Sequence, residues 1–194
     1  MRGPLHSFVH AAGVFALLVG GFTAAQAASA LTRADGNFMK EAAQAGQVEV
    51  EASKIALQRA RHTQVRAFAQ QMVDDHGKVQ QELVALAALK SLKLQDKPSV
   101  AARTGLKLLA TADEAKFDER YAKSYGVRAH RDAVALFQKA ANRAVDPEVR
   151  AFAAKTLPVL QQHLTQAEDM RQAVERDAKA SLQSAAASAA APKR

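Results

Sequence analysis

The chain has 194 residues, a formal net charge of +8 and no cysteine. The lack of cysteine excludes disulfides and thiolate metal sites, so a hydrophobic core has to stabilise the fold. The basic residues are scattered along the sequence, and two Tyr and no Trp are available for stacking on bases. We therefore expect no nucleic-acid partner and at most a weak attraction to anionic surfaces of the cell envelope.

The first 27 residues are typical of an export signal. Arg2 precedes an uncharged apolar stretch over residues 8–22, and residues 25–27, Ala-Gln-Ala, fit a small-x-small cleavage site. The alternative is a membrane anchor, but the stretch is short for a span of roughly 20 apolar residues. We predict a cleaved signal peptide over residues 1–27 and a periplasmic or envelope location.

Two amphipathic helices are predicted next, over about 35–60 and 63–89. Small and apolar side chains recur at helical spacing in both, and no stretch shows sustained two-residue alternation. Glu49 falls inside the apolar stripe of the first helix, and His76 lies at the centre of the stripe of the second.

A connector should follow over about 91–111, because Pro98 breaks any helix there. Residues 106–110 are expected to add a short helical turn. A third helix is predicted over about 112–144, with His130 in its apolar stripe.

The fourth helix should begin at Pro147, a residue favoured at the first helical position, and end near Asp177. Its inward stripe contains His163, and Pro158 interrupts its backbone hydrogen bonding. Residues 178–194 are rich in Ala and Ser, and we predict a disordered tail there.

The two helix pairs resemble a repeat. Residues 65–69, Val-Arg-Ala-Phe-Ala, recur identically at 149–153, and each copy is followed by a histidine of the apolar stripe. A duplicated hairpin predicts an all-α fold over residues 35–177, an antiparallel four-helix bundle with a long connector between its second and third helices.

In such a bundle Glu49, His76, His130 and His163 should meet near one level of the core. Glu49 stands 14 residues before the first turn near residue 63, and His76 stands 13 after it. The corresponding numbers at the second turn, near residue 145, are 15 and 18, a mismatch of roughly 4.5 Å at 1.5 Å per residue.

Imidazoles and a carboxylate together suit zinc, iron, copper or manganese, so the four residues form a candidate metal site. The alternative is a buried hydrogen-bonded cluster without metal. Asp75 is expected to orient His76 from outside the ligand set. We expect no catalytic residue elsewhere, because no Ser or Cys nucleophile has a histidine and an acid beside it and no phosphate loop is present.

Several segments resemble the exported family called domain of unknown function 4142. The most specific are residues 72–76, Met-Val-Asp-Asp-His, and residues 157–163, Leu-Pro-Val-Leu-Gln-Gln-His, within a resemblance that covers about 35–174. Members of that family are described as ferritin-like helical bundles and sometimes labelled predicted outer-membrane proteins. The resemblance therefore implies a ferritin-like bundle and a metal centre, although no activity is attached to the family.

The chain departs from the ferritin-type di-iron pattern, which needs Glu-x-x-His on two helices. Val73 and Leu160 stand three residues before His76 and His163. We therefore expect either a bundle that binds one transition-metal ion or a metal-free structural or stress-related interaction protein of the cell envelope. The sequence also lacks the alternating strands that an outer-membrane barrel would need.

Overall fold

The computed structural model describes residues 31–190, and this part of the chain is all-α, without a strand. The predicted signal peptide, residues 1–27, lies outside the described residues. No helix among residues 31–190 combines the length and apolar character needed to cross a membrane. The elements in chain order are α1 (Arg33–Arg59), α2 (Thr63–Leu89), α3 (Val100–Ala110), α4 (Glu114–Tyr121), a π-helical segment η1 (Ala122–Arg128), α5 (Ala129–Arg143) and α6 (Pro147–Ala190).

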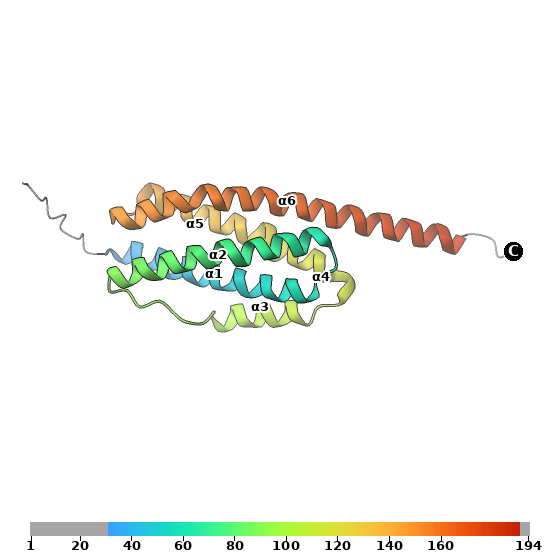
Figure 1. Cartoon of the computed structure of the whole chain (residues 1–194), viewed down its shortest axis with the longest axis horizontal. Helices are drawn as coiled ribbons and strands as arrows, with labels where there is room; N and C mark the ends of the chain where they lie inside the picture. The colour runs from blue at the N-terminus through green and yellow to red at the C-terminus, as the bar shows by residue number, and fades with distance from the viewer. Residues whose placement is uncertain (1–30, 191–194) are drawn as a thin grey trace, which may run out of the picture.

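The helices form an elongated bundle (Figure 1). α1 packs along α2 as one hairpin, and α5 packs along α6 as another. α3 lies on the outer side of α1, and α6 also contacts η1 and α2. The start of α1, the end of α2 and the α5–α6 turn therefore share one end of the bundle, while the α1–α2 turn and α4 share the other.

Side-chain caps fix several helix ends. The hydroxyl of Thr32 accepts a hydrogen bond from the backbone N–H of Asp35 at the start of α1, and the hydroxyl of Ser99 caps α3 in the same way. The carboxylate of Asp35 accepts hydrogen bonds from the backbone N–H groups of Val145 and Asp146 in the α5–α6 turn. These contacts tie the start of one hairpin to the turn of the other.

The helix boundaries agree with the prediction for α1 and α2 and differ at three places. α3 begins at Val100, so it is longer than the expected turn at 106–110. The predicted third helix is one continuous helical segment, but η1 interrupts its α-helical hydrogen bonding. α6 continues past Asp177 to Ala190.

The extension of α6 corrects the prediction of a disordered tail from residue 178. Ala is the strongest helix former, and no Gly or Pro occurs between residues 178 and 190. The side chains of residues 175–188 are exposed, so local propensity rather than packing maintains this part of the helix. In Figure 1 it extends beyond the rest of the bundle. Residues 191–194 lie outside the described part of the chain.

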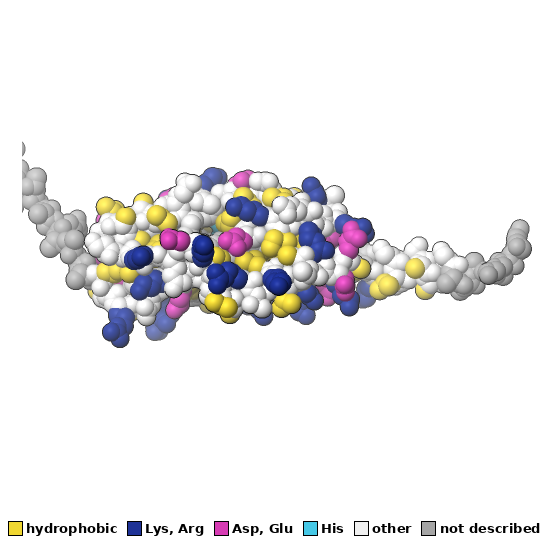
Figure 2. Space-filling model, turned by 90° about the horizontal axis from the view of Figure 1, so that it is seen from below, with side chains coloured by type: hydrophobic (Ala, Val, Ile, Leu, Met, Phe, Trp, Pro, Cys, Tyr) yellow, Lys and Arg dark blue, Asp and Glu magenta, His cyan; other side chains and the backbone are white. Residues whose placement is uncertain are grey.

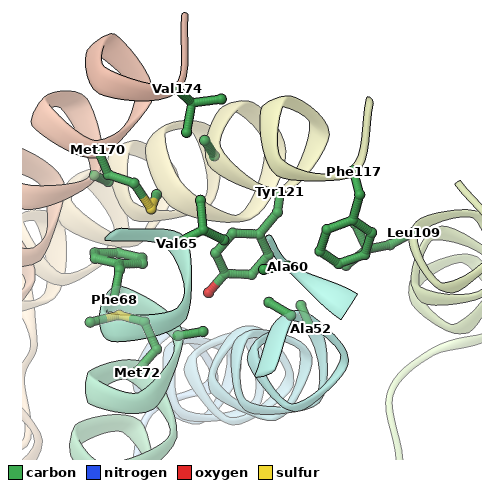
Figure 3. Packing of buried hydrophobic residues seen from close by; sticks show 14 of the residues in the cluster. Ala52, Ala60, Val65, Phe68, Met72, Leu109, Phe117, Tyr121, Met170 and Val174 are labelled. Carbon is green, nitrogen blue, oxygen red and sulfur yellow. The ribbon is translucent and has the colours of Figure 1, made fainter. Parts of the chain in front are cut away.

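Two hydrophobic clusters fill the core. In the first, Tyr121 lies among aromatic and aliphatic side chains from α1, α2 and α6 (Figure 3), and Phe117 packs towards Leu109 of α3. The second cluster lies nearer the α5–α6 turn and includes Phe38, Phe137 and Phe152. Burial of large apolar side chains of this kind contributes about 1.5–3 kcal/mol each to folding.

A polar layer separates the two clusters. Along α1, Glu49 lies between Ala43 of the second cluster and Ala52 of the first. His76, His130 and His163 occupy the same kind of gap on α2, α5 and α6, and all four side chains are buried. We call Glu49, His76, His130 and His163 the polar layer.

The surface is mixed in charge. Figure 2 shows Lys and Arg side chains spread over the face seen from below, with Asp and Glu side chains among them. Several opposite charges form exposed pairs, such as Lys155 with Glu82 and Arg131 with Glu168. Exposed pairs of this kind contribute little to stability, so they identify no binding surface.

Candidate metal centre

The structure brings all four residues of the polar layer together. The Nε2 atom of His76 lies 2.8 Å from Oε2 of Glu49 and 3.3 Å from Nε2 of His130. The three imidazole centroids form a nearly equilateral triangle with sides of 5.4, 5.5 and 5.5 Å. One ring nitrogen from each histidine lies within 4.8 Å of the other two. Three potential nitrogen ligands and a carboxylate therefore converge at one level of the core.

The π-helical segment η1 orients His130. The ring nitrogen Nδ1 of His130 lies 2.8 Å from the carbonyl oxygen of Gly126, which can only accept, so Nδ1 carries the proton. In the neutral ring Nε2 then has a free lone pair that faces the layer. The proton in the 3.3 Å contact between the two Nε2 atoms consequently belongs to His76. π-Helical turns within α-helices are rare and frequently occur at functional sites.

Gly126 also allows η1 to approach α6 closely. A Cβ atom at this position would lie 2.9 Å from Cε of Met170 and 3.4 Å from Cβ of Ala167. A larger residue would therefore displace the end of the Met170 side chain at the turn that carries the carbonyl partner of His130.

Asp75 orients His163, which corrects the expectation that it would orient His76. Its Oδ2 atom lies 3.2 Å from Nε2 of His163. Neighbouring residues of a helix point about 100° apart, so Asp75 faces α6 while His76 faces the core. The carboxylate accepts a hydrogen bond from the N–H group at Nε2, so the lone pair of the neutral ring lies on Nδ1 of His163.

Three buried atoms of the polar layer have no hydrogen-bond partner among residues 31–190. They are Nδ1 of His163 and both carboxylate oxygens of Glu49, of which Oε2 is ion-paired with His76. An unsatisfied buried polar atom costs about 1–3 kcal/mol and calls for an explanation. A small cavity of about 20 Å³, lined in part by Glu49 and His76, lies beside the layer. Such a volume is close to that needed for a single water-sized particle.

The protonation equilibria of the layer are shifted in opposite directions. Burial and the charges of His76 and His130 lower the pKa of His163 from 6.5 to about 4, although Asp75 opposes the shift. Burial also lowers the pKa of His130. For His76, burial acts in the same direction, but the charge of Glu49, the hydrogen bond to it and the charge of Asp75 together outweigh burial and raise the pKa. Burial raises the pKa of Glu49, but the charge of His76, the hydrogen bond to it and the charges of the other two histidines together outweigh burial and lower that pKa.

Gly126 and Ser53 are neighbours of the layer that were not predicted from the sequence. The hydroxyl groups of Ser53 and Tyr121 lie 2.8 Å apart in the core, one helical turn from Glu49. The spacing of four residues from Ser53 to Glu49 and from Gly126 to His130 was the available signal, because such residues share a helix face.

His62 does not join the layer. Its Nδ1 accepts a hydrogen bond from the backbone N–H of Gln64 and caps α2, and its Nε2 lies 3.2 Å from Oδ2 of Asp177. The ring is largely covered.

Comparison with known proteins shows a similar fold in two solved structures. A DUF305 fragment from Deinococcus radiodurans has a TM-score of 0.63 and 16% identity, and the likeness covers 75% of this chain and 98% of the fragment. CopM in the Cu(I)-bound form has a TM-score of 0.60 and 18% identity, over 71% of this chain and 95% of CopM. At these identities the likeness concerns the fold alone.

No curated protein matches the sequence. The model of one family matches residues 21–170, which is more than half of the chain. The resemblance seen in the sequence segments is thereby confirmed, and the chain belongs to the family described as Domain of unknown function (DUF4142).

Proposed function

We propose that this protein binds one transition-metal ion through Glu49, His76, His130 and His163. The observation that carries the proposal is the convergence of three ring nitrogens within 4.8 Å of one another beside a buried carboxylate. Imidazole and carboxylate are the ligand types that zinc, iron, copper and manganese accept in proteins.

The outer contacts of the histidines support this proposal. Metal-binding histidines usually donate their second ring N–H to a backbone carbonyl or a carboxylate, which fixes the ring and its tautomer. His130 does so to Gly126 and His163 does so to Asp75. The buried Nδ1 of His163 then has no protein partner among the described residues, and a cation would satisfy it.

The identity of the metal is open among iron, zinc, copper and manganese. Copper belongs in any test, because CopM, which has a similar fold, was solved in its Cu(I)-bound form. A ferritin-type di-iron centre is disfavoured, because Val73 and Leu160 stand where Glu-x-x-His motifs would place glutamates. A bound ion would supply Lewis acidity or, for iron and copper, one-electron redox chemistry.

The same proposal describes the fold as a ferritin-like antiparallel four-helix bundle. It is supported by the two packed hairpins, α1–α2 and α5–α6, and by the connector between them. The metal would then lie at mid-height between helices, where bundles of this class place their metal sites.

The test is a titration of the purified protein with Zn²⁺, Cu²⁺, Fe²⁺ and Mn²⁺, followed by the melting temperature. An ion that binds only the folded state must stabilise it, by about 2.7 kcal/mol at a hundredfold excess over Kd. We expect one ion per chain, loss of the effect in His76→Ala and His163→Ala, and retention in the control His62→Ala. No shift with any ion, or shifts that survive in both layer variants, would refute the proposal.

A metal-free role as a structural or stress-related interaction protein of the envelope is the second candidate. The contact of 2.8 Å between Glu49 and His76 favours it, because the two groups compensate each other's charge without an ion. The histidines would then serve only core hydrogen bonding. Stoichiometric metal in natively purified protein, with a change in a binding or redox readout on its removal, would refute this candidate.

We further propose an envelope location after export, supported by the sequence of residues 1–27. Cell fractionation and N-terminal sequencing of the purified protein would test it. The proposal predicts a mature N-terminus at Ala28, whereas an intact Met1 in the cytoplasmic fraction would contradict it.

A further inference from the structure

One groove of the surface is acidic, although the chain as a whole carries a net charge of +8. It has a volume of about 410 Å³ and lies between α1 and α5, with the start of α3 on one side. Its charged lining residues are Glu41, Glu49 and Asp132, with neither Lys nor Arg among the described residues that line it. Glu41 and Asp132 are exposed, so solvent and ions reach both carboxylates.

Glu49 connects this groove to the polar layer. Its side chain is 4% exposed and lines the groove, and its Oε1 atom has no hydrogen-bond partner within residues 31–190. Its other oxygen, Oε2, lies 2.8 Å from Nε2 of His76. The small cavity beside the layer shares Ala45, Glu49 and Ala133 with the groove. One carboxylate thus borders the groove on one side and the histidines on the other.

Two other approaches to the layer, along the bundle axis and between α2 and α6, are less favourable for a cation. The two hydrophobic clusters close it along the bundle axis. On the α2–α6 side the partly exposed Asp75 is engaged with His163, and the ammonium group of Lys78 lies 3.5 Å from its Oδ1. A positive charge at that position repels an approaching cation.

We propose that the acidic groove between α1 and α5 is the route by which hydrated divalent transition-metal cations reach the polar layer, with Glu49 as the ligand that transfers the ion to the histidines. This inference rests on the proposed metal binding. Glu41 and Asp132 raise the local cation concentration at the groove, since a cleft lined by one sign of charge steers the opposite sign towards it. Neither carboxylate belongs to the proposed ligand set, so both act on the rates at which the ion enters and leaves the layer.

The test measures the association rate of Co²⁺ with the purified protein by stopped-flow absorbance. The double variant Glu41→Gln/Asp132→Asn is compared with Glu51→Gln, which removes an exposed carboxylate of α1 outside the groove. At low salt we expect the double variant to bind about tenfold more slowly. The control should keep the wild-type rate. Near 1 M salt the difference should disappear, because the Debye length falls to about 3 Å.

The equilibrium dissociation constant separates a route from a ligand role. Because the groove acids steer the ion without ligating it, association and dissociation should slow together, and Kd should change less than threefold. Wild-type binding with an unchanged rate in the double variant would overturn the groove inference and leave the proposed function intact. If the wild-type protein binds no metal, the groove inference and the proposed metal-binding function are both refuted.

Discussion

Each histidine of the polar layer is held by a different partner, and this determines its protonation. His163 faces Asp75, His130 faces the Gly126 carbonyl, and His76 faces Glu49. Three protonated imidazoles cannot share one core site without strong repulsion, so within the layer only His76, which faces the buried carboxylate of Glu49, has a raised pKa. His130 and His163 therefore each keep a ring-nitrogen lone pair at neutral pH, while the Nε2 proton of His76 faces Glu49.

The lowered pKa of His163 predicts a loss of stability in acid for the metal-free protein. The unfolded chain takes up this proton near pH 6.5 and the folded chain only near pH 4, so unfolding is favoured as the pH falls between these values. Between pH 7.5 and pH 5 the contribution of His163 should lower the free energy of unfolding by about 2 kcal/mol. His76 acts in the opposite direction, because its stabilisation is present below pH 6.5 and is lost above its raised pKa.

Substitution isolates the contribution of His163. In the presence of a chelator, urea unfolding at both pH values should show a larger loss for the wild type than for His163→Gln. Equal losses in the two proteins would mean that His163 is not buried in its neutral form.

Asp75 should act on metal affinity through His163. Asp75→Asn weakens the contact that fixes the ring of His163, and removal of such outer partners typically lowers metal affinity by 10–100-fold. Asp74→Asn is the matched control, since Asp74 is exposed and bonded to Gln70. Isothermal titration calorimetry with the ion that binds most tightly measures the metal affinity of each variant. Equal affinities of Asp75→Asn and Asp74→Asn would show that Asp75 does not act on the metal site.

At the scale of the elements, the repeat explains why the layer lies at mid-height. Val65, Phe68 and Ala69 are buried in the first cluster, and the matching residues of 149–153 are buried in the second. The two copies thus anchor the beginnings of α2 and α6 at opposite ends of the bundle. Each helix then runs past the middle, where its histidine lies.

Two glycines provide a paired test of η1. Gly77→Ala has no neighbour within 4 Å of the added Cβ, so it should stabilise the protein by about 0.5–1 kcal/mol through helix propensity. Gly126→Ala meets Met170 at 2.9 Å in the core. The end of the Met170 side chain can move, but overpacking of a core in this way typically lowers the free energy of unfolding by about 1–3 kcal/mol.

We therefore expect a higher melting temperature for Gly77→Ala and a lower one for Gly126→Ala, with metal affinity reduced in the latter alone. A stabilised Gly126→Ala with wild-type affinity would show that close packing at η1 does not position His130.

The elements show why some features were predictable and others were not. The limits of α1 and α2 follow from the apolar stripes and from the polar turn between them. The π-helical segment changes hydrogen bonding without changing the composition of the stripe, so a 3.6-residue period does not reveal it. The length of α6 was underestimated because an Ala-rich run was interpreted as low complexity, although Ala favours helix.

At the scale of the whole molecule, helix phase and height were enough to bring Glu49 and the three histidines together. Both depend only on helical geometry and on short turns, which the sequence specifies. The outer partners depend on rotations between helices and on local backbone irregularity. Asp75 was therefore assigned to the wrong histidine, and the Gly126 carbonyl was missed.

The two hydrophobic clusters on either side of the layer also bear on function. They keep water away from the layer along the bundle axis, which strengthens electrostatic interactions within it. An ion bound there would be enclosed by the folded protein, so its binding energy would add directly to the stability of the bundle.

The most direct test of the central claim is the metal content of the protein purified from its native cells without chelators. Elemental analysis of the wild type and of the double variant His76→Ala/His163→Ala should be compared at equal protein concentration. We predict close to one transition-metal ion per chain in the wild type and a background level in the variant. A wild-type protein free of metal, or a variant that retains the same ion in the same amount, would contradict it.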